Sequence, residues 1–394
     1  MSRSGDRKNV RGDAGGPESG TPGYAEAFLQ GSASARDAYG RFNLGIVGNT
    51  GVGKSSLVNA VFGRDHAKVG KGLPVTRGVH YYHDASLGIW DFEGFEIGSA
   101  QSPRDMLREN LATIARRPAE EQIAVVWYCV SAQADRLTEH DLTMIRELDA
   151  SGLPVILVLT KVAWTRNPVT GKHRAPRDVE EFRDWCENPV DADGVPVDLP
   201  VQRVLLTAAQ GKDGKGVGFG LSELVAETLS LAPDNEKDAF RVAQRLSLPM
   251  KRQMARPVIL TASAASATAA AAPIPFADAA VLAPIQMTMM GRISVIYDLE
   301  LATMLSASTL AQLGTQITGR ALARSFIKLI PAAGNVINGS IAFALTAATG
   351  EAWVRLCEAL HTGKIDQSEL GQVWRDFSPT VVNVVANLVK ERGR

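Results

Sequence analysis

Short apolar runs alternate with helix-length segments between Arg41 and about residue 232. Each run is bounded by glycine, proline or polar residues, which is typical of the strands of a parallel α/β sheet. The pattern predicts one doubly wound, mostly parallel α/β domain over residues 40–232. Its six predicted strands are 42–47, 79–83, 87–90, 123–130, 155–159 and 204–206, and its five predicted helices are 55–62, 104–115, 138–148, 177–186 and 220–231.

The strand pattern stops after about residue 233, and charged residues become rare. Three segments, 257–277, 301–319 and 329–350, contain no charged residue and are rich in alanine, serine and threonine. They predict an all-α, Ala-rich helical domain over residues 235–360, followed by a helical tail over 361–394. Residues 1–38 are rich in glycine, serine, aspartate and arginine, and a segment of that composition buries too little apolar surface to offset its ordering entropy. We therefore expect residues 1–38 to form a disordered arm.

Charge and cysteine content exclude several classes of protein. The 42 basic and 42 acidic side chains cancel, so bulk positive charge cannot drive nucleic-acid binding. The 3 cysteines lack the spacing of a zinc site or a disulfide framework, which favours a reducing compartment. The first residues lack the apolar core of a signal peptide, so we expect a cytoplasmic chain.

A phosphate-binding motif follows the first predicted strand. Residues 48–55, GNTGVGKS, match the pattern G-x-x-x-x-G-K-[ST] between a strand and a helix. Glycines let backbone N–H groups turn toward phosphates, and the start of the helix adds partial positive charge. Lys54 would reach the β- and γ-phosphates, and Ser55 would place its hydroxyl on Mg²⁺. The predicted nucleotide contacts here are Gly48, Asn49, Thr50, Gly51, Val52, Gly53, Lys54, Ser55 and Ser56.

Two further segments supply candidate groups for the metal and the γ-phosphate. Thr76 is the only threonine between the phosphate loop and Asp91, and its hydroxyl would coordinate Mg²⁺ when the γ-phosphate is present. Asp91 and Gly94 form a D-x-x-G motif after an apolar run. Asp91 would hold the metal through water, and the N–H of Gly94 would approach the γ-phosphate. We predict Ser55, Thr76 and Asp91 as the metal site and Lys54, Thr76 and Gly94 as the catalytic residues.

The segments expected to bind the base are Thr160-Lys161 and Thr207-Ala208, each at the end of a predicted strand. A guanine site favours a carboxylate two residues after the lysine, because it accepts both the ring N–H and the exocyclic amine. Ala163 stands there instead. Losing a bidentate contact of this kind weakens base discrimination by about 1–3 kcal/mol unless another group, such as one in residues 164–200, replaces it.

Together these motifs resemble the Era/TrmE-like branch of translation-factor-class GTPases. Residues 126–130, with Arg136 and Asp141, resemble more specifically a subgroup whose G domain precedes an Ala-rich helical domain of unknown function. That helical domain is similar to the YcjF-type membrane-protein domain, and residues 273–275 and 328–334 resemble it too. Immunity-related GTPases have a similar layout. The resemblance implies a P-loop NTPase fold for the G domain, GTP and Mg²⁺ as cofactors, and GTP hydrolysis as the activity.

Two positions depart from relatives of this kind. Phe95 follows Gly94, where many GTPases carry the glutamine that orients the attacking water. A phenyl ring cannot make that hydrogen bond, so we expect slow intrinsic hydrolysis, assisted by a partner, by a second protomer across the nucleotide face, or by backbone groups. Gly51 stands where potassium-stimulated relatives carry asparagine, so potassium activation is not expected.

The uncharged segments of the helical half leave three alternatives open: a soluble small-residue bundle, reversible membrane association, and a spanning helix. Alanine and threonine contribute little to insertion, and the asparagines in segment 329–350 oppose it. Arg241, Arg245, Arg252 and Arg256 recur at helical spacing and would stripe one helix face, with Pro249 as an interruption. Such a stripe either contacts an anionic leaflet or is simply solvated.

Three hypotheses of function follow. The first is a Mg²⁺-dependent GTP switch that controls membrane or partner engagement by the helical domain. The second is a ribosome- or RNA-associated assembly GTPase. Zero net charge and the lack of a recognisable RNA-binding module count against it. The third, raised only by Ala163, is an ATP-using or nucleotide-held scaffold.

Overall fold

A seven-stranded sheet forms the core of the first domain, with the order β2-β3-β4-β1-β5-β6-β9. The computed structural model describes residues 23–63, 73–76, 78–92, 102–211, 217–271, 278–300 and 335–365. β1, β4, β5, β6 and β9 are parallel neighbours, whereas β3 runs antiparallel to both β2 and β4. The strands are β1 Phe42–Val47, β2 Leu73–Thr76, β3 Val79–His83, β4 Leu87–Phe92, β5 Val125–Ser131, β6 Val155–Thr160 and β9 Arg203–Leu206. The expected mostly parallel α/β fold is confirmed.

One strand of this sheet was not among the six expected from the pattern. β2 has only 4 residues, including a proline, and lies at the edge of the sheet beside β3. Proline is tolerated at an edge, where no neighbour needs its missing N–H, but it hides the strand from sequence patterns. Two small hairpins lie outside the main sheet: β7 Thr165–Arg166 with β8 His173–Arg174, and β10 Ala208–Gln210 with β11 Val217–Phe219.

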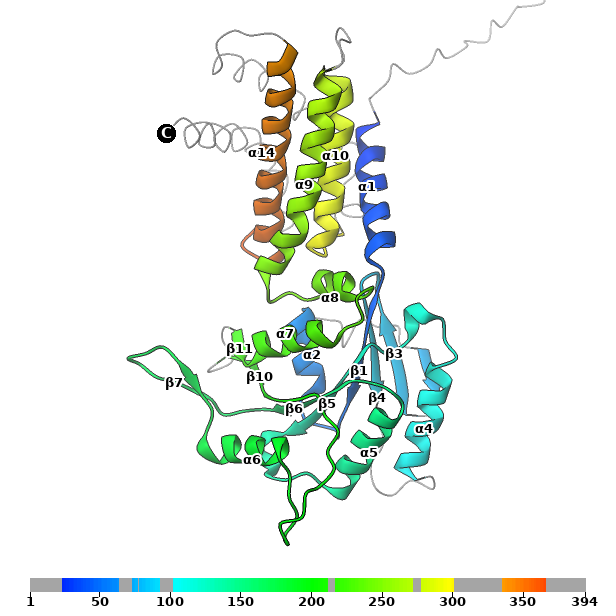
Figure 1. Cartoon of the computed structure of the whole chain (residues 1–394), viewed down its shortest axis with the longest axis vertical. Coiled ribbons are helices and arrows are strands. Elements are labelled where there is room, and N and C mark those ends of the chain that lie inside the picture. Colours follow the sequence, from blue (N-terminus) through cyan, green and yellow to red (C-terminus); the bar gives the residue numbers. More distant parts are fainter. Residues whose placement is uncertain are drawn as a thin grey trace, which may run out of the picture.

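Helices cover both faces of the sheet (Figure 1). Alternation along β5 decides which side chain faces which layer: Tyr128 packs among residues of α4, α5 and α6, whereas Trp127 packs among residues of α2, α7 and α8. These helices are α2 Lys54–Phe62, α4 Pro103–Ile114, α5 Glu139–Ala150, α6 Arg177–Glu187, α7 Leu221–Leu231 and α8 Lys237–Ala243, with short 3₁₀ turns at η1 Ala119–Glu121 and η2 Ala132–Ala134. All five helices expected in this domain are present.

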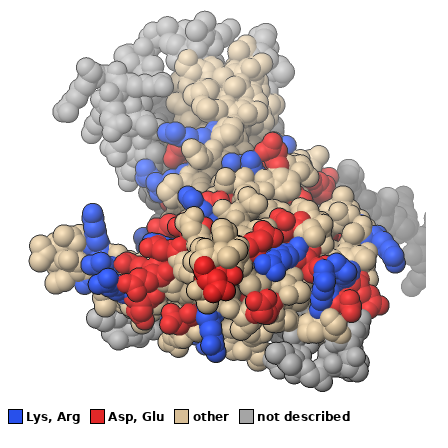
Figure 2. All heavy atoms as spheres, turned by 60° about the horizontal axis from the view of Figure 1, so that its bottom comes forward, with Lys and Arg blue, Asp and Glu red and all other residues tan. Residues whose placement is uncertain are grey.

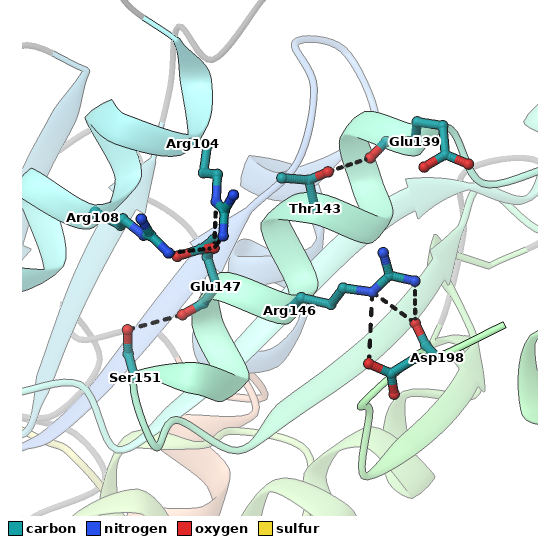
Figure 3. Close-up of polar contacts among 8 residues, drawn as sticks. All are labelled: Arg104, Arg108, Glu139, Thr143, Arg146, Glu147, Ser151 and Asp198. Carbon is teal, nitrogen blue, oxygen red and sulfur yellow. Dashed lines mark hydrogen bonds and ion pairs between the residues drawn. The ribbon is translucent and has the colours of Figure 1, made fainter.

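A buried carboxylate joins α4 to α5. Arg104 and Arg108 of α4 both converge on Glu147 of α5 (Figure 3), whose side chain is only 8% exposed. The two guanidinium groups lower the pKa of Glu147, with Arg108 contributing most. Arg146, one residue earlier, points the other way and donates to the backbone oxygen of Asp198. Glu147 therefore fastens two helices on one face of the sheet.

The second domain is a bundle of long helices, in agreement with the expected all-α half. Its helices are α1 Tyr24–Tyr39, α9 Leu248–Ala271, α10 Asp278–Ile296 and α14 Asn335–His361. Phe28, Tyr297 and Trp353 are fully buried in its core, and Phe28 meets Trp353 edge to face. Hydrogen bonds from Gln286 to Thr346 (3.1 Å) and from Thr346 to Ser266 (2.9 Å) link α10, α14 and α9 inside the bundle. Within the described residues, no helix is both long and apolar enough to cross a membrane.

The prediction of a disordered arm is wrong over its second half. Residues Tyr24–Tyr39 form α1, which packs along α10 although it precedes the sheet domain in the sequence (Figure 1). Gly31 permits this close packing, because a Cβ there would lie 2.3 Å from the carbonyl oxygen of Thr288. The composition of the arm concealed α1, since its few apolar residues become buried only by packing against the other helices of the bundle. Residues 1–22 lie outside the described part of the chain.

The predicted arginine stripe is also wrong as a single helix face. α8 ends at Ala243 and α9 begins at Leu248, so Arg241 and Arg252 lie on different helices. The side-chain amide of Gln244 donates to the oxygens of Arg241 and Ser247, each at 3.2 Å. These hydrogen bonds stabilise the turn between α8 and α9.

The bundle joins the sheet domain at the edge where the parallel strands β1 and β4 begin (Figure 1). Phe240 of α8 meets Phe42 at the start of β1, with ring centroids 4.8 Å apart. The N–H of Arg245 donates to the oxygen of Val61 near the end of α2 (2.8 Å). Ser86, in the β3–β4 turn, donates to the Asp298 carboxylate (3.3 Å). The phosphate motif lies at the opposite edge, where β1 ends.

Candidate nucleotide site

The predicted phosphate loop connects β1 to α2 and contains three glycines with positive φ. Gly48, Gly51 and Gly53 have φ values of 142°, 80° and 105°. A Cβ at Gly48 would lie only 2.3 Å from the carbonyl oxygen of Cys129 on β5. Any larger residue would therefore push the loop away from the sheet, so Gly48 is required by space as well as by conformation.

Lys54 crosses this loop from the first turn of α2. It is 7% exposed, and its Nζ donates a 2.8 Å hydrogen bond to the oxygen of Gly48. Asn49, Thr50, Gly51, Ser55 and Ser56 are all exposed. The first N–H groups of a helix have no intrahelical acceptor and carry partial positive charge. The loop thus combines backbone N–H groups at the start of α2 with an ammonium group held across it, which are the groups that phosphate binding requires.

Two candidate metal ligands lie on adjoining elements. Asp91, near the end of β4, is the register partner of Ile46 on β1, two residues before Gly48. The exposed Ser55 lies at the start of α2. Hydroxyl and carboxylate oxygens suit Mg²⁺, which usually takes only one or two protein ligands and completes its shell with water and phosphate. The described residues contain no cluster of three or more His, Cys, Asp or Glu side chains. This donor set fits Mg²⁺ held together with a nucleotide.

Of the residues expected near the γ-phosphate, the structure describes Thr76 but not Gly94 or Phe95. Thr76 is the last residue of β2, and its backbone pairs with Val79 of β3. Gly94 and Phe95 lie outside the described residues. Their predicted roles remain predictions.

Cys129 is a residue of the site that motif reading did not select. Its backbone oxygen occupies the space that a side chain at Gly48 would need. Burial raises the pKa of its thiol to about 12; the charge of Lys54 acts to lower this pKa and that of Asp91 to raise it. The thiol is therefore neutral near pH 7 and unsuited to nucleophilic chemistry. Only the pairing of β5 with β1 brings Cys129 here, and no sequence pattern signals it.

Thr160 and Thr207, both predicted nucleotide contacts, are buried beneath the loops. The Thr160 hydroxyl lies 2.6 Å from the oxygen of Val52 and 3.1 Å from that of Val130. The backbone of Thr207 bonds to the Leu159 oxygen (2.7 Å) and accepts from the N–H of Val162 (3.1 Å). In this arrangement both threonines position loops, Thr160 by holding the phosphate loop onto the end of β6.

Lys161 and Ala208, the other two residues expected to contact the base, follow β6 and begin β10. Lys161 has a positive φ of 58°, and its alkyl chain passes over Gly53, with Cε 3.7 Å from the position of an added Cβ. Ala208 begins β10 directly after Thr207. Ala163 is exposed and carries no hydrogen-bonding side chain.

An aromatic cluster lies beside this segment. Trp164 packs against His173 of β8, with centroids 4.4 Å apart, and against Phe219 of β11, with centroids 6.1 Å apart. Trp164, which directly follows Ala163, therefore contacts both small hairpins. The cluster adds apolar surface next to the region expected to bind the base.

Comparison with known proteins agrees with this geometry. Residues 43–161 match the family described as "50S ribosome-binding GTPase". These residues form a P-loop GTPase domain. Residues 235–381 match a domain of unknown function, DUF697. The phosphate loop, Asp91 and Thr160-Lys161 all lie within the matched part of the P-loop GTPase domain.

The curated relatives match about a third of this chain. GTPase Der of Bifidobacterium longum is 34% identical over 119 residues, 30% of this chain and 25% of its own length. The probable GTP-binding protein EngB of Caldanaerobacter subterraneus is 31% identical over 30% of this chain and 61% of its own length. GTPase Era of Neisseria meningitidis is 30% identical over 35% of this chain and 43% of its own length. The chain thus spans less than two thirds of each of these relatives.

Among solved structures, that of a probable GTP-binding protein EngB has 18% sequence identity to this chain and a TM-score of 0.32. The match covers 48% of this chain and 97% of the EngB chain.

Proposed function

We propose that this protein binds GTP with Mg²⁺ and hydrolyses it slowly, as a member of the Era/TrmE-like branch of GTPases. The observation that carries the proposal is the loop from Gly48 to Ser55, with Lys54 held across it and Asp91 on the adjoining strand. Backbone N–H groups and Lys54 would bind the phosphates, and Ser55, Thr76 and Asp91 would hold the metal. When bound, Mg²⁺ neutralises charge on the β- and γ-phosphates.

The residues named above explain how the nucleotide would be bound, but they include no side chain that would position the attacking water. Lys54 is positioned to stabilise negative charge that develops on the phosphates. Gly94 would donate its backbone N–H to the γ-phosphate. With Phe95 in place of a glutamine, water positioning would come from backbone groups, a partner or a second copy of this chain facing the nucleotide.

We further propose that the nucleotide acts as a switch for the helical domain, at the cytoplasmic face of a membrane or on a partner. The junction supports this. Arg245 contacts Val61 near the end of α2, the helix that starts with Lys54. Asp298 contacts Ser86, in the turn between β3 and β4, and β4 leads to Asp91. Movements at the phosphate edge would therefore reach the bundle through α2 and β4.

The direct test is nucleotide binding by the full chain and by the Lys54→Ala variant. Titration with fluorescent GTP and Mg²⁺ should give saturable binding that Lys54→Ala abolishes. The variant should keep its helical circular dichroism, because the side chain of Lys54 makes only one hydrogen bond among the described residues. Equal binding by both chains would refute the assignment, as would tighter binding of ATP than of GTP.

Turnover measured against protein concentration tests the assisted mechanism. A rate per molecule that rises with concentration is expected if a second copy positions the water. A ribosome-associated role is the second candidate, favoured by the family description of residues 43–161 and by similarity to GTPase Era. Co-sedimentation with ribosomal particles in the GTP-bound state would support that role.

A further inference from the structure

In α9, α10 and α14 the uncharged residues are gathered at one end of each helix, apart from Asp278 at the start of α10. On α9 the last charged residue is Arg256, and residues 257–271 carry no charge. Residues 279–291 of α10 and 335–350 of α14 are likewise uncharged. α9, α10 and α14 pack side by side, so their uncharged parts lie together at the end far from the sheet (Figure 1).

Arginines gather at the boundary between the two parts. A cavity of about 440 Å³ lies between α9 and α14, and Arg252, Arg256 and Arg355 line it, with Glu351 as its acid. Arg252 is paired with Glu358, and its side chain is still 61% exposed. Arg256 and Arg355 are exposed, and neither forms an ion pair with another described residue. Figure 2 shows basic side chains, with acidic ones among them, around the junction of the two domains and uncharged surface on the visible bundle beyond it.

The exposed face of α9 changes character at this cavity. Arg252, Arg256, Leu260 and Ala264 follow one another at four-residue spacing, so they lie on one face of the helix. All four are exposed, and Leu260 is 59% exposed although it is a large apolar residue. One helix face thus runs from two guanidinium groups to an apolar surface within about three turns.

We propose that the cavity between α9 and α14 binds the phosphate headgroup of an anionic phospholipid, with the uncharged end of the bundle entering the lipid. Arginine forms charge-assisted hydrogen bonds with phosphate, and Leu260 then lies on the acyl-chain side of the headgroup. Fifteen uncharged residues of α9 extend about 22 Å, which is less than the roughly 30 Å hydrocarbon core. The bundle therefore enters one leaflet and does not span. A lipid fits better than free phosphate, because phosphate would leave the apolar face in water.

This proposal rests on the proposed function, since it names the membrane that the switch would engage. The test is flotation of the full chain with vesicles of phosphatidylglycerol and phosphatidylcholine, compared with pure phosphatidylcholine. The Arg256→Gln/Arg355→Gln variant should bind anionic vesicles about 25-fold more weakly, from about fivefold per charge. The matched control is Arg177→Gln/Arg203→Gln, which removes two charges from exposed side chains of the sheet domain and should bind as the original chain does.

Equal binding by the cavity variant and the original chain would overturn the proposal, as would equal affinity for the two kinds of vesicle. Displacement by millimolar inorganic phosphate at constant ionic strength would assign the cavity to free phosphate instead. GTP binding is measured on the same samples. A chain that binds GTP but no vesicles refutes only the lipid site, whereas one that binds vesicles but no GTP refutes only the proposed function.

Discussion

The hydroxyl of Thr160 lies 2.6 Å from the backbone oxygen of Val52 and so fastens the end of β6 to the phosphate loop. Thr160→Val keeps the shape of the side chain but removes the donor from the part-buried oxygen of Val52 and the buried oxygen of Val130. A more mobile loop loses more conformational entropy when it binds GTP, so we expect GTP affinity to fall about 5- to 10-fold. Titration with fluorescent GTP measures this.

Thr160→Ser is the control for that experiment, because it keeps the donor and should retain most of the affinity. If the valine variant binds GTP as tightly as the original chain, Thr160 does not position the loop.

Ala163→Asp should raise the preference for GTP over ATP. Ala163 is exposed two residues after Lys161, whose chain lies over the phosphate loop. A carboxylate there can accept two hydrogen bonds from guanine and none from adenine in the same geometry. We expect the ratio of the two affinities to increase about 10- to 100-fold, from about 1–3 kcal/mol. Competition of unlabelled GTP and ATP against fluorescent GTP gives the ratio. Ala163→Asn should produce a smaller gain. An unchanged ratio would indicate that another group already reads the base.

Glu147→Gln should destabilise the P-loop GTPase domain. The substitution keeps the volume of a side chain that is 8% exposed but removes the charge that holds Arg104 and Arg108. We expect the free energy of unfolding to fall by about 1–3 kcal/mol, less than for a fully buried pair because both arginines are half exposed. Hydrogen exchange of the α4 and α5 amides measures it locally. Glu181→Gln breaks the exposed Arg177–Glu181 pair and should change stability by less than about 0.5 kcal/mol. Equal losses of stability in the two variants would show that the buried Glu147 contributes no more than the exposed Arg177–Glu181 pair.

His361 should make the bundle less stable in weak acid. Its Nδ1 lies 2.9 Å from the oxygen of Tyr297, and burial, with nearby Lys251 and Arg245, lowers its pKa to about 4. In the unfolded chain this pKa is about 6.5, so the unfolded state binds more protons between pH 4 and 6.5. The contribution of His361 to the free energy of unfolding is therefore complete above about pH 6.5 and is lost as the pH falls toward 4.

The measurement is hydrogen exchange of α14 amides at pH 7 and pH 5, corrected for intrinsic rates, in the original chain and in His361→Gln. The original chain should lose about 1–2 kcal/mol more than the variant over this interval. Parallel losses would mean that other groups account for the acid sensitivity.

Motifs and periodicity were reliable where neighbouring residues in the chain determine the structure. The loop from Gly48 to Ser55 is specified by glycines that need positive φ and by a strand and helix on either side. The five helices that the sequence predicted in the first domain follow from the alternation of apolar strands with helix-length segments. β2 escaped detection, because a four-residue strand with a proline becomes a strand only by pairing with β3.

Long-range contacts decided the rest. α1 has the composition of a disordered segment and is ordered against α10, about 250 residues later in the chain. The arginines from Arg241 to Arg256 have helical spacing, yet the turn at Gln244 separates α8 from α9, so these arginines do not share one helix.

By itself, then, the sequence determined the fold class, the phosphate loop and the division into a sheet domain and a helical domain, since these depend on local conformational preference and on which residues are apolar. Only the tertiary structure decided that Thr160 supports the loop from below, that Cys129 requires a glycine at position 48, and that Arg256 and Arg355 share one cavity. Such relationships arise when strands and helices far apart in the chain pack together, and no pattern along the chain records that packing.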